Sequence, residues 1–301
     1  MKVMPVCVGE VDLNGPVLTA AGTGGLGAEL SEYGDLSELG GVVVKSLASF
    51  EWSGNPAPRV ASWGESMVNS VGLSGPGIAR WLEEYLPDLR KTKARVVAST
   101  WGRSVQEYAD VAQALINSGV VAIEVNASCP NLEGRTGIFA HSAKLTAELV
   151  AASKVGGVPV WIKLSPNTPD LVSIAEAAIE AGADALVLTN TLLGMVIDTK
   201  SRSPILGNEV GGVSGRGIFP VALRAVYECR AAFPDIPIVG VGGIASGEEA
   251  AAMIMAGADA VEVGTATFEN PRAPWRIQRE LFEWLSANGT TLTEIKGAAH
   301  G

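Results

Sequence analysis

A thiol and several amide side chains follow an apolar stretch in the middle of the chain. The stretch 120–125 leads directly into Asn126, Ser128, Cys129 and Asn131. Amide groups both donate and accept hydrogen bonds, so this set could hold a polar ligand beside the thiol. If the reaction needs a base, Cys129 is the candidate by elimination, because His141 and His300 lie outside this segment.

The other two cysteines, Cys7 and Cys229, have no such polar neighbours and are interpreted as structural. Three cysteines at wide spacing indicate reduced thiols in a cytosolic protein, and no pair has the spacing of metal ligands. The sequence therefore predicts no metal site.

Glycine-rich turns follow two apolar stretches near the C-terminus. Backbone N–H groups in such turns can bind a phosphate group, although tight turns alone would also require glycine. The candidate contacts are Gly242, Gly243, Gly264 and Thr265, with Ser214 and Gly215 as a further pair. An earlier glycine pattern, 22–27, resembles a dinucleotide site, but Lys45 stands where an acidic residue is needed. Only Gly22 is kept, as a position of close approach.

A phosphate site without a Walker motif or a dinucleotide fold suggests a mononucleotide cofactor, and flavin mononucleotide (FMN) fits. Lys45 and Lys163 each end an apolar stretch. One such lysine could simply extend to solvent along its apolar stem. Two at equivalent positions favour a role beside a flavin, where a cation stabilises the negative charge that arrives with a hydride.

The composition indicates one large core. The 301 residues are 47% hydrophobic and 18% charged, with a net charge of −10. We therefore expect a single domain over 1–301, and the acidic balance argues against nucleic acid. No apolar run approaches the roughly 18 residues that span a bilayer, and the N-terminus does not resemble a signal peptide. A cytoplasmic protein with no membrane contact is predicted.

Eight short apolar runs alternate with amphipathic stretches. The predicted strands are 16–21, 41–44, 95–99, 120–126, 158–163, 184–190, 236–241 and 260–264. Their continuous hydrophobicity is typical of parallel strands covered on both faces. Helices are expected at 104–118, 169–181, 220–233 and 246–256. The pattern predicts an α/β fold, a (β/α)8 TIM barrel, with an open doubly wound sheet as the alternative.

Two connections are long, 46–77 after the second strand and 191–219 after the sixth. Both follow the carboxyl ends of strands, where barrel enzymes hold their active sites. In a barrel, the polar residues that end all eight strands would converge on one cavity.

Several motifs within 5–285 resemble the dihydroorotate dehydrogenase family. They lie at 44–46, 54–59, 69–73, 126–131, 189–191, 211–215, 240–244 and 263–265. A cysteine before Pro130 resembles the soluble class 1 branch. The loop 131–139 resembles the NAD-linked class 1B more than the fumarate-using class 1A.

The resemblance implies oxidation of dihydroorotate to orotate in de novo pyrimidine biosynthesis. Cys129 would remove the proton from carbon 5, and FMN would accept the hydride from carbon 6. The implied substrate contacts are Lys45, Asn69, Ser70, Val71, Gly72, Leu73, Asn126, Asn131, Asn190 and Thr191. The implied FMN contacts are Ala21, Gly22, Lys45, Ser46, Ser99, Asn126, Lys163, Thr189, Ser214, Gly215, Gly242, Gly243, Gly264 and Thr265. Asn167 is typical of the family, with no direct contact assigned.

The class 1B resemblance also implies a homodimer core and a second subunit that carries FAD and a [2Fe–2S] cluster and passes electrons to NAD. This chain has no cysteine cluster that could hold the iron–sulfur group. Two residues depart from the family pattern: Gly75 stands where an asparagine is usual, and Arg216 stands where the family often has a proline.

Other functions stay open on the sequence alone. They are the class 1A enzyme, a flavoenzyme for another dihydropyrimidine, a barrel that binds a sugar phosphate without redox chemistry, and a flavin-binding scaffold that would not need Cys129.

Overall fold

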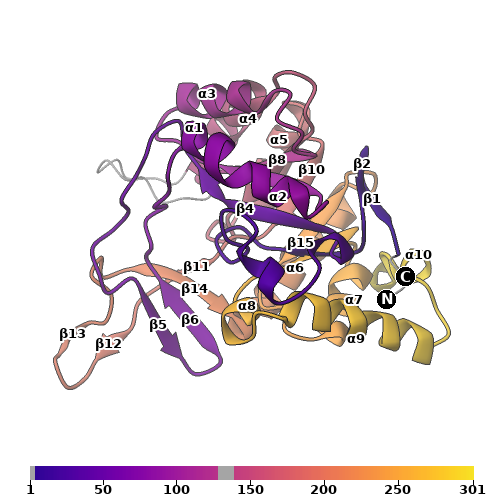
Figure 1. Ribbon diagram of the computed structural model, residues 1–301. Coiled ribbons are helices and arrows are strands. Elements are labelled where there is room, and N and C mark those ends of the chain that lie inside the picture. Colours follow the sequence, from indigo (N-terminus) through magenta and orange to yellow (C-terminus); the bar gives the residue numbers. More distant parts are fainter. Residues whose placement is uncertain (1–3, 128–138) are drawn as a thin grey trace.

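Eight parallel strands close into a barrel in the computed structural model of the protein, which describes residues 4–127 and 139–301 (Figure 1). In chain order they are β3 (Val17–Thr19), β4 (Gly41–Leu47), β7 (Val96–Thr100), β8 (Ala122–Asn126), β9 (Val160–Leu164), β10 (Ala185–Leu188), β15 (Ile238–Val241) and β16 (Ala260–Val263). Because β16 pairs with β3 and β9 pairs with β10, the sheet has no free edge. The barrel prediction is confirmed, and the open-sheet alternative is wrong.

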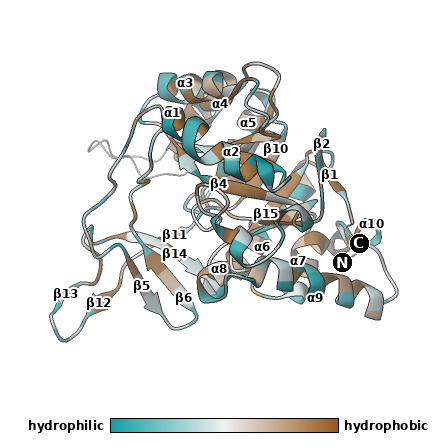
Figure 2. Ribbon diagram, viewed as in Figure 1, coloured by the Kyte–Doolittle hydropathy of each residue, from teal (hydrophilic) through white to brown (hydrophobic). Residues whose placement is uncertain are grey.

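Every residue of the eight strands except Lys45 is buried, as their continuous apolar sequences predict. Figure 2 shows this as brown ribbon along β4 and β15, against teal on much of α2 at the surface. Side chains on one face of each strand fill the barrel interior, and those on the other face pack under the helices.

Helices form the outer layer. They are α1 (Ile78–Arg80), α2 (Leu86–Lys91), α3 (Val105–Leu115), α4 (Ala143–Ser153), α5 (Leu171–Glu180), α6 (Phe219–Ala232), α7 (Gly247–Met255), α8 (Ala266–Glu269), α9 (Ala273–Ala287) and α10 (Leu292–Ile295). Neighbours pack in sequence order, α3 on α4, α4 on α5, α5 on α6 and α6 on α7. The four predicted helices are confirmed as α3, α5, α6 and α7. Among the residues described, no helix combines the length and hydrophobicity needed to cross a membrane.

Helix α3 is shorter than its apolar stripe suggests. Ser104 accepts a hydrogen bond from the backbone N–H of Glu107, as an N-cap does. The Glu107 carboxylate binds the backbone and guanidinium of Arg103. The last helical residue is Leu115, because Ile116 already leaves the helical conformation.

A hairpin that the sequence did not predict covers the amino-terminal end of the barrel. Strands β1 (Val6–Val8) and β2 (Val11–Leu13) pair antiparallel, and Val8, Val11 and Leu13 pack on the interior side chains. This end of the barrel is therefore closed by apolar contacts.

The two long insertions lie at the opposite end and form a second sheet. Strands β5 (Val60–Trp63) and β6 (Ser66–Asn69) come from the first insertion, and β11 (Leu192–Gly194) and β14 (Gly211–Gly215) from the second. They join in the order β11-β14-β6-β5, antiparallel throughout, and lie beside the barrel in Figure 1. A small hairpin, β12 (Ile197–Asp198) and β13 (Ser203–Pro204), extends from it. Segments more than 100 residues apart thus meet above the carboxyl ends of the barrel strands.

Candidate functional site

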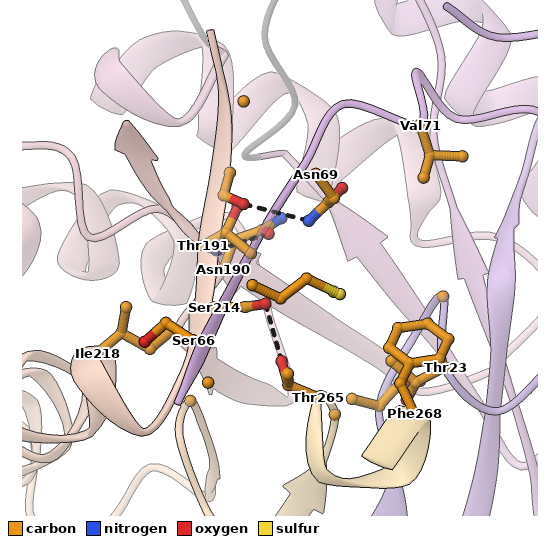
Figure 3. Close-up of a pocket in the computed structure, with 18 of the residues that line it drawn as sticks. Thr23, Ser66, Asn69, Val71, Asn190, Thr191, Ser214, Ile218, Thr265 and Phe268 are labelled. Atoms are coloured by element: carbon orange, nitrogen blue, oxygen red, sulfur yellow. Dashed lines mark hydrogen bonds between the residues drawn. The ribbon is translucent and has the colours of Figure 1, made fainter. Parts of the chain in front are cut away.

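A cavity of about 1240 Å³ lies between the carboxyl ends of the barrel strands and the inserted sheet. Figure 3 shows side chains from both sources facing it, with Asn69 and Ser66 from the sheet and Thr265 from the barrel. A typical small-molecule site measures roughly 300–1,000 Å³, so this cavity can hold more than one ligand.

Nearly all the described residues predicted for the site line this one cavity. They are Ala21, Gly22, Lys45, Ser46, Asn69, Ser70, Val71, Gly72, Leu73, Asn126, Lys163, Thr189, Asn190, Thr191, Ser214, Gly215, Gly242, Gly243, Gly264 and Thr265. Ser99 is the exception: it is fully buried behind Ser46, and their hydroxyl oxygens lie 2.9 Å apart. Cys129 and Asn131 lie outside the described residues.

Three amide side chains of the cavity wall are held by hydrogen bonds, two of them to each other. Asn190 Nδ2 donates to Asn126 Oδ1 at 3.0 Å, and Asn126 Nδ2 donates to Ser46 Oγ at 3.3 Å. Asn69, on β6, donates to the backbone carbonyl of Gly212 on β14 at 3.3 Å. These bonds hold the amides in defined orientations, as recognition of a planar polar ligand requires.

Asn167 has a positioning role. Its Nδ2 donates to the Thr191 carbonyl at 2.9 Å, and its Oδ1 accepts from the backbone N–H of Leu193 at 2.8 Å. One amide therefore fixes the start of the second insertion and, with it, the place of Thr191 in the cavity wall.

The glycine turns form another part of the wall. Gly243 has φ of +75°, and a Cβ there would lie 2.7 Å from the Phe219 backbone nitrogen. A side chain would thus be both strained and too close. Thr265 Oγ1 donates to Ser214 Oγ at 2.8 Å, which joins the turn after β16 to the inserted sheet (Figure 3). Steric need accounts for Gly243 itself, and the convergence of the turns on the cavity leaves the phosphate prediction intact.

Lys163 is the second-last residue of β9, lies inside the barrel and is 5% exposed. Its Nζ lies 2.9 Å from Glu262 Oε2 and 3.4 Å from Glu124 Oε2, and both glutamate side chains are fully buried. Burial by itself lowers the pKa of Lys163, but the charges of Glu124 and Glu262 outweigh it and hold that pKa above its ordinary value. At neutral pH the ammonium group is therefore charged.

Sequence reasoning missed Glu124 and Glu262. The available signal was one acidic residue in each of two otherwise apolar strands. Glu124 stands two residues before Asn126, and Glu262 stands two residues before Gly264. Acidic side chains are rarely fully buried unless they are paired, so their presence in such strands indicated a buried cation.

The comparisons with known proteins agree with the architecture and the site. The family model described as dihydroorotate dehydrogenase matches residues 3–285. This chain belongs to the dihydroorotate dehydrogenase family. Two similar proteins are each named "Dihydroorotate dehydrogenase B (NAD(+)), catalytic subunit". The one from Alkaliphilus metalliredigens is 46% identical over 271 residues, 90% of this chain and 89% of its own. The one from Desulforamulus reducens is 42% identical over 300 residues, 99% of this chain and 98% of its own.

The two departures from the dihydroorotate dehydrogenase pattern occupy different places. Arg216 lines the cavity near the glycine turns, and its guanidinium lies 3.3 Å from the Glu249 carboxylate. Gly75 pairs with Trp52 through two backbone hydrogen bonds and does not line the cavity. A Cβ at Gly75 would meet its nearest atom, the Ser46 carbonyl oxygen, only at 3.8 Å.

The two described cysteines differ in their exposure to solvent. Cys229 is buried in α6, and burial raises the pKa of its thiol to about 12, so it is protonated and inert at neutral pH. This confirms its structural interpretation. Cys7 is exposed on β1 and its thiol donates to Asp12 Oδ1 at 3.2 Å, so it is not a buried core residue as its interpretation implied.

Proposed function

We propose that this chain oxidises dihydroorotate to orotate with FMN as the hydride acceptor, as the catalytic subunit of a class 1B enzyme. The observation that carries the proposal is the single cavity in which both predicted lysines, the amide side chains and the glycine turns meet. Membership of the dihydroorotate dehydrogenase family and the similarity to catalytic subunits of the NAD(+) type support it.

The donor set fits FMN. Backbone-rich turns at Gly243 and Gly264 suit a phosphate, and the Lys163 ammonium group suits the ring. Bound FMN would supply hydride acceptance, which no side chain of the chain can provide. The residues around it orient the substrate and balance charge.

On the substrate side, Asn69, Asn126 and Asn190 offer donors and acceptors that match the carbonyl and N–H groups of a pyrimidine ring. Lys45, from the end of β4, supplies a positive charge that matches the substrate carboxylate. Held in this way, the ring would keep one orientation relative to the flavin. Fixing two reactants in the reactive geometry can supply much of the rate acceleration of a bimolecular reaction.

Cys129 is proposed as the general base that removes the proton from carbon 5. It follows Asn126 by three residues in the chain, and the hydrogen-bonded pair of Asn126 and Asn190 is part of the proposed substrate site. The two other cysteines are poor candidates, because Cys229 is buried in a helix and Cys7 lies on the hairpin at the far end of the barrel.

An anaerobic half-reaction tests the proposal. Purified protein loaded with FMN should show flavin absorbance, which bleaches when dihydroorotate is added. Cys129→Ala should retain the flavin but lose bleaching at neutral pH, whereas Cys7→Ala, the matched control, should bleach at the normal rate. Protein that fails to bind added FMN would overturn the proposal, and bleaching by Cys129→Ala would overturn the role of the thiol.

The electron acceptor requires a second experiment. We propose that electrons leave through a partner subunit with FAD and a [2Fe–2S] cluster, built on a homodimer of this chain, and then reach NAD. Reduced protein should reoxidise with NAD only in the presence of a co-purified iron–sulfur flavoprotein. Rapid reoxidation by fumarate alone would instead identify the class 1A activity.

A further inference from the structure

Three ionisable side chains form a closed cluster inside the barrel, below the cavity floor. We call Glu124 on β8, Lys163 on β9 and Glu262 on β16 the acid–lysine cluster. Lys163 Nζ contacts both carboxylates, at 2.9 Å and 3.4 Å, and Lys163 alone of the three lines the cavity. Because both carboxyl groups contact the same Nζ atom, Glu124 and Glu262 are close neighbours in the barrel interior.

The described barrel strands offer this cluster only one other charge, the partly exposed Lys45. Among the described strands, β3, β7, β10 and β15 carry no ionisable residue, and β4 carries only Lys45. If both glutamates were ionised, the cluster would hold a net negative charge in the dry interior. A buried uncompensated charge is strongly unfavourable, and the usual response is that the group takes up a proton.

One atom of the cluster points to where that proton resides. Glu262 Oε1 is buried and has no hydrogen-bond partner, although Oε2 of the same group accepts from Lys163. An oxygen without a partner is tolerated far better on a neutral carboxyl group than on a carboxylate. Burial and the neighbouring Glu124 charge also raise the pKa of Glu262 well above its ordinary value.

We propose that Glu124 and Glu262 share one proton and act together as a single counterion for Lys163. The acid–lysine cluster is then neutral, and Lys163 keeps its ammonium group at the cavity. Both glutamates are positioning residues, because they act only through Lys163.

The consequence for the cofactor rests on the proposed function. A neutral cluster neither favours nor opposes the negative charge of a reduced flavin, beyond the local dipole that Lys163 directs at it. Replacing either glutamate with glutamine leaves the other as the sole carboxylate, so the net charge stays at zero. The two single variants should therefore behave alike.

Infrared spectroscopy of the protein without flavin tests the shared proton directly. At neutral pH the wild type should show the carbonyl stretch of a protonated buried carboxyl group. Glu124→Gln and Glu262→Gln should each lose it, because the remaining glutamate becomes ionised, while the exposed Glu83→Gln should keep it. Absence of the band from the wild type, or its persistence in either single variant, would overturn the proposal.

The reduction potential of bound FMN tests the charge balance. Glu124→Gln and Glu262→Gln should each change the reduction equilibrium constant less than threefold. Lys45→Met, which removes one charge at the rim, should make the potential more negative and shows that the assay detects a single charge. An increase of tenfold or more in the reduction equilibrium constant of either glutamine variant would contradict the shared proton; for a two-electron couple it corresponds to a potential about 30 mV more positive. It would mean that both acids are ionised in the wild type or that the proton is fixed on one of them. Failure to bind FMN at all would count against the proposed function and leave the infrared test standing.

Discussion

Lys45 and Lys163 have different surroundings at the mouth of the barrel. Both lysines lie near the carboxyl ends of apolar strands, and both line the same cavity. Lys163 is buried and contacts two fully buried carboxylates, whereas Lys45 is partly exposed on a strand that continues to Leu47. The same residue type at the same kind of position therefore has two environments, one dry and balanced, the other solvated.

The difference shows what each cation can contribute. A charge in contact with solvent is screened by salt, and the side chain that carries it can move when a ligand enters or leaves. A charge held in a low-dielectric interior is fixed in place and insensitive to salt. We expect Lys45 to act on the exchanging substrate and Lys163 to act on the resident cofactor.

The largest effect should come from Lys163→Met. The substitution leaves two buried carboxyl groups without their cation, and removal of one partner from a buried ion pair costs about 3–5 kcal/mol. Lys45→Met should change the free energy of unfolding by less than about 1 kcal/mol, as is usual away from buried features. Urea denaturation of both variants measures the contrast, and equal losses would contradict it.

A smaller effect is expected on ligand affinity. Loss of a hydrogen bond to a charged group costs about 1.5–3 kcal/mol, so Lys45→Met should weaken orotate binding by roughly 10- to 100-fold. The remaining affinity should depend less on salt, because the screened charge is gone. Spectral titration of the flavin at two ionic strengths measures both changes. The exposed Lys200→Met serves as the control and should bind as the wild type does.

The acid–lysine cluster should also make the stability of the protein depend on pH. Because the folded pKa of Glu262 is raised, its contribution to stability is present below the ordinary carboxyl pKa of about 4.3 and is lost as the pH rises towards the folded value. The folded cluster binds one proton more than the unfolded chain in this window. Wild-type stability should therefore fall relative to Glu262→Gln by up to about 1.4 kcal/mol per pH unit. Parallel stability curves for the two proteins would refute this assignment.

The smallest expected effect concerns the hydroxyl pair beside Lys45. Ser99→Ala removes a buried hydrogen bond to Ser46, which should cost about 1 kcal/mol of stability. Because Ser99 does not line the cavity, flavin affinity should stay within threefold. Ser46→Ala should reduce both the stability and the flavin affinity, since Ser46 lines the cavity. Calorimetry measures the change in stability and flavin titration the change in affinity. A large loss of flavin affinity in Ser99→Ala would support the predicted contact between Ser99 and FMN.

Much of the barrel was predictable because a parallel strand covered on both faces has to be apolar throughout. All eight strands were located in this way, and so were the two long insertions after β4 and β10. The antiparallel sheet within these insertions was not predicted. Its strands are short and partly exposed, and β6 pairs with β14, a segment more than 100 residues later. No local pattern encodes such a pairing.

For the site, residue type and strand end correctly indicated Lys45, Lys163, Asn126 and Asn190 as neighbours of one cavity. Strands β9 and β16 lie far apart in the chain, and no local pattern indicates how close they come in space. The contact of Lys163 with Glu262 was therefore not foreseen.

By itself, the sequence determined which residues must be buried and which must end the strands, because hydrophobic periodicity acts over a few residues. Closure of the sheet decided the rest. It brings β8, β9 and β16 around one interior, where Lys163 Nζ lies within 3.5 Å of two carboxyl groups from other strands. The charges of these groups must balance, because a buried charge is costly unless it is paired.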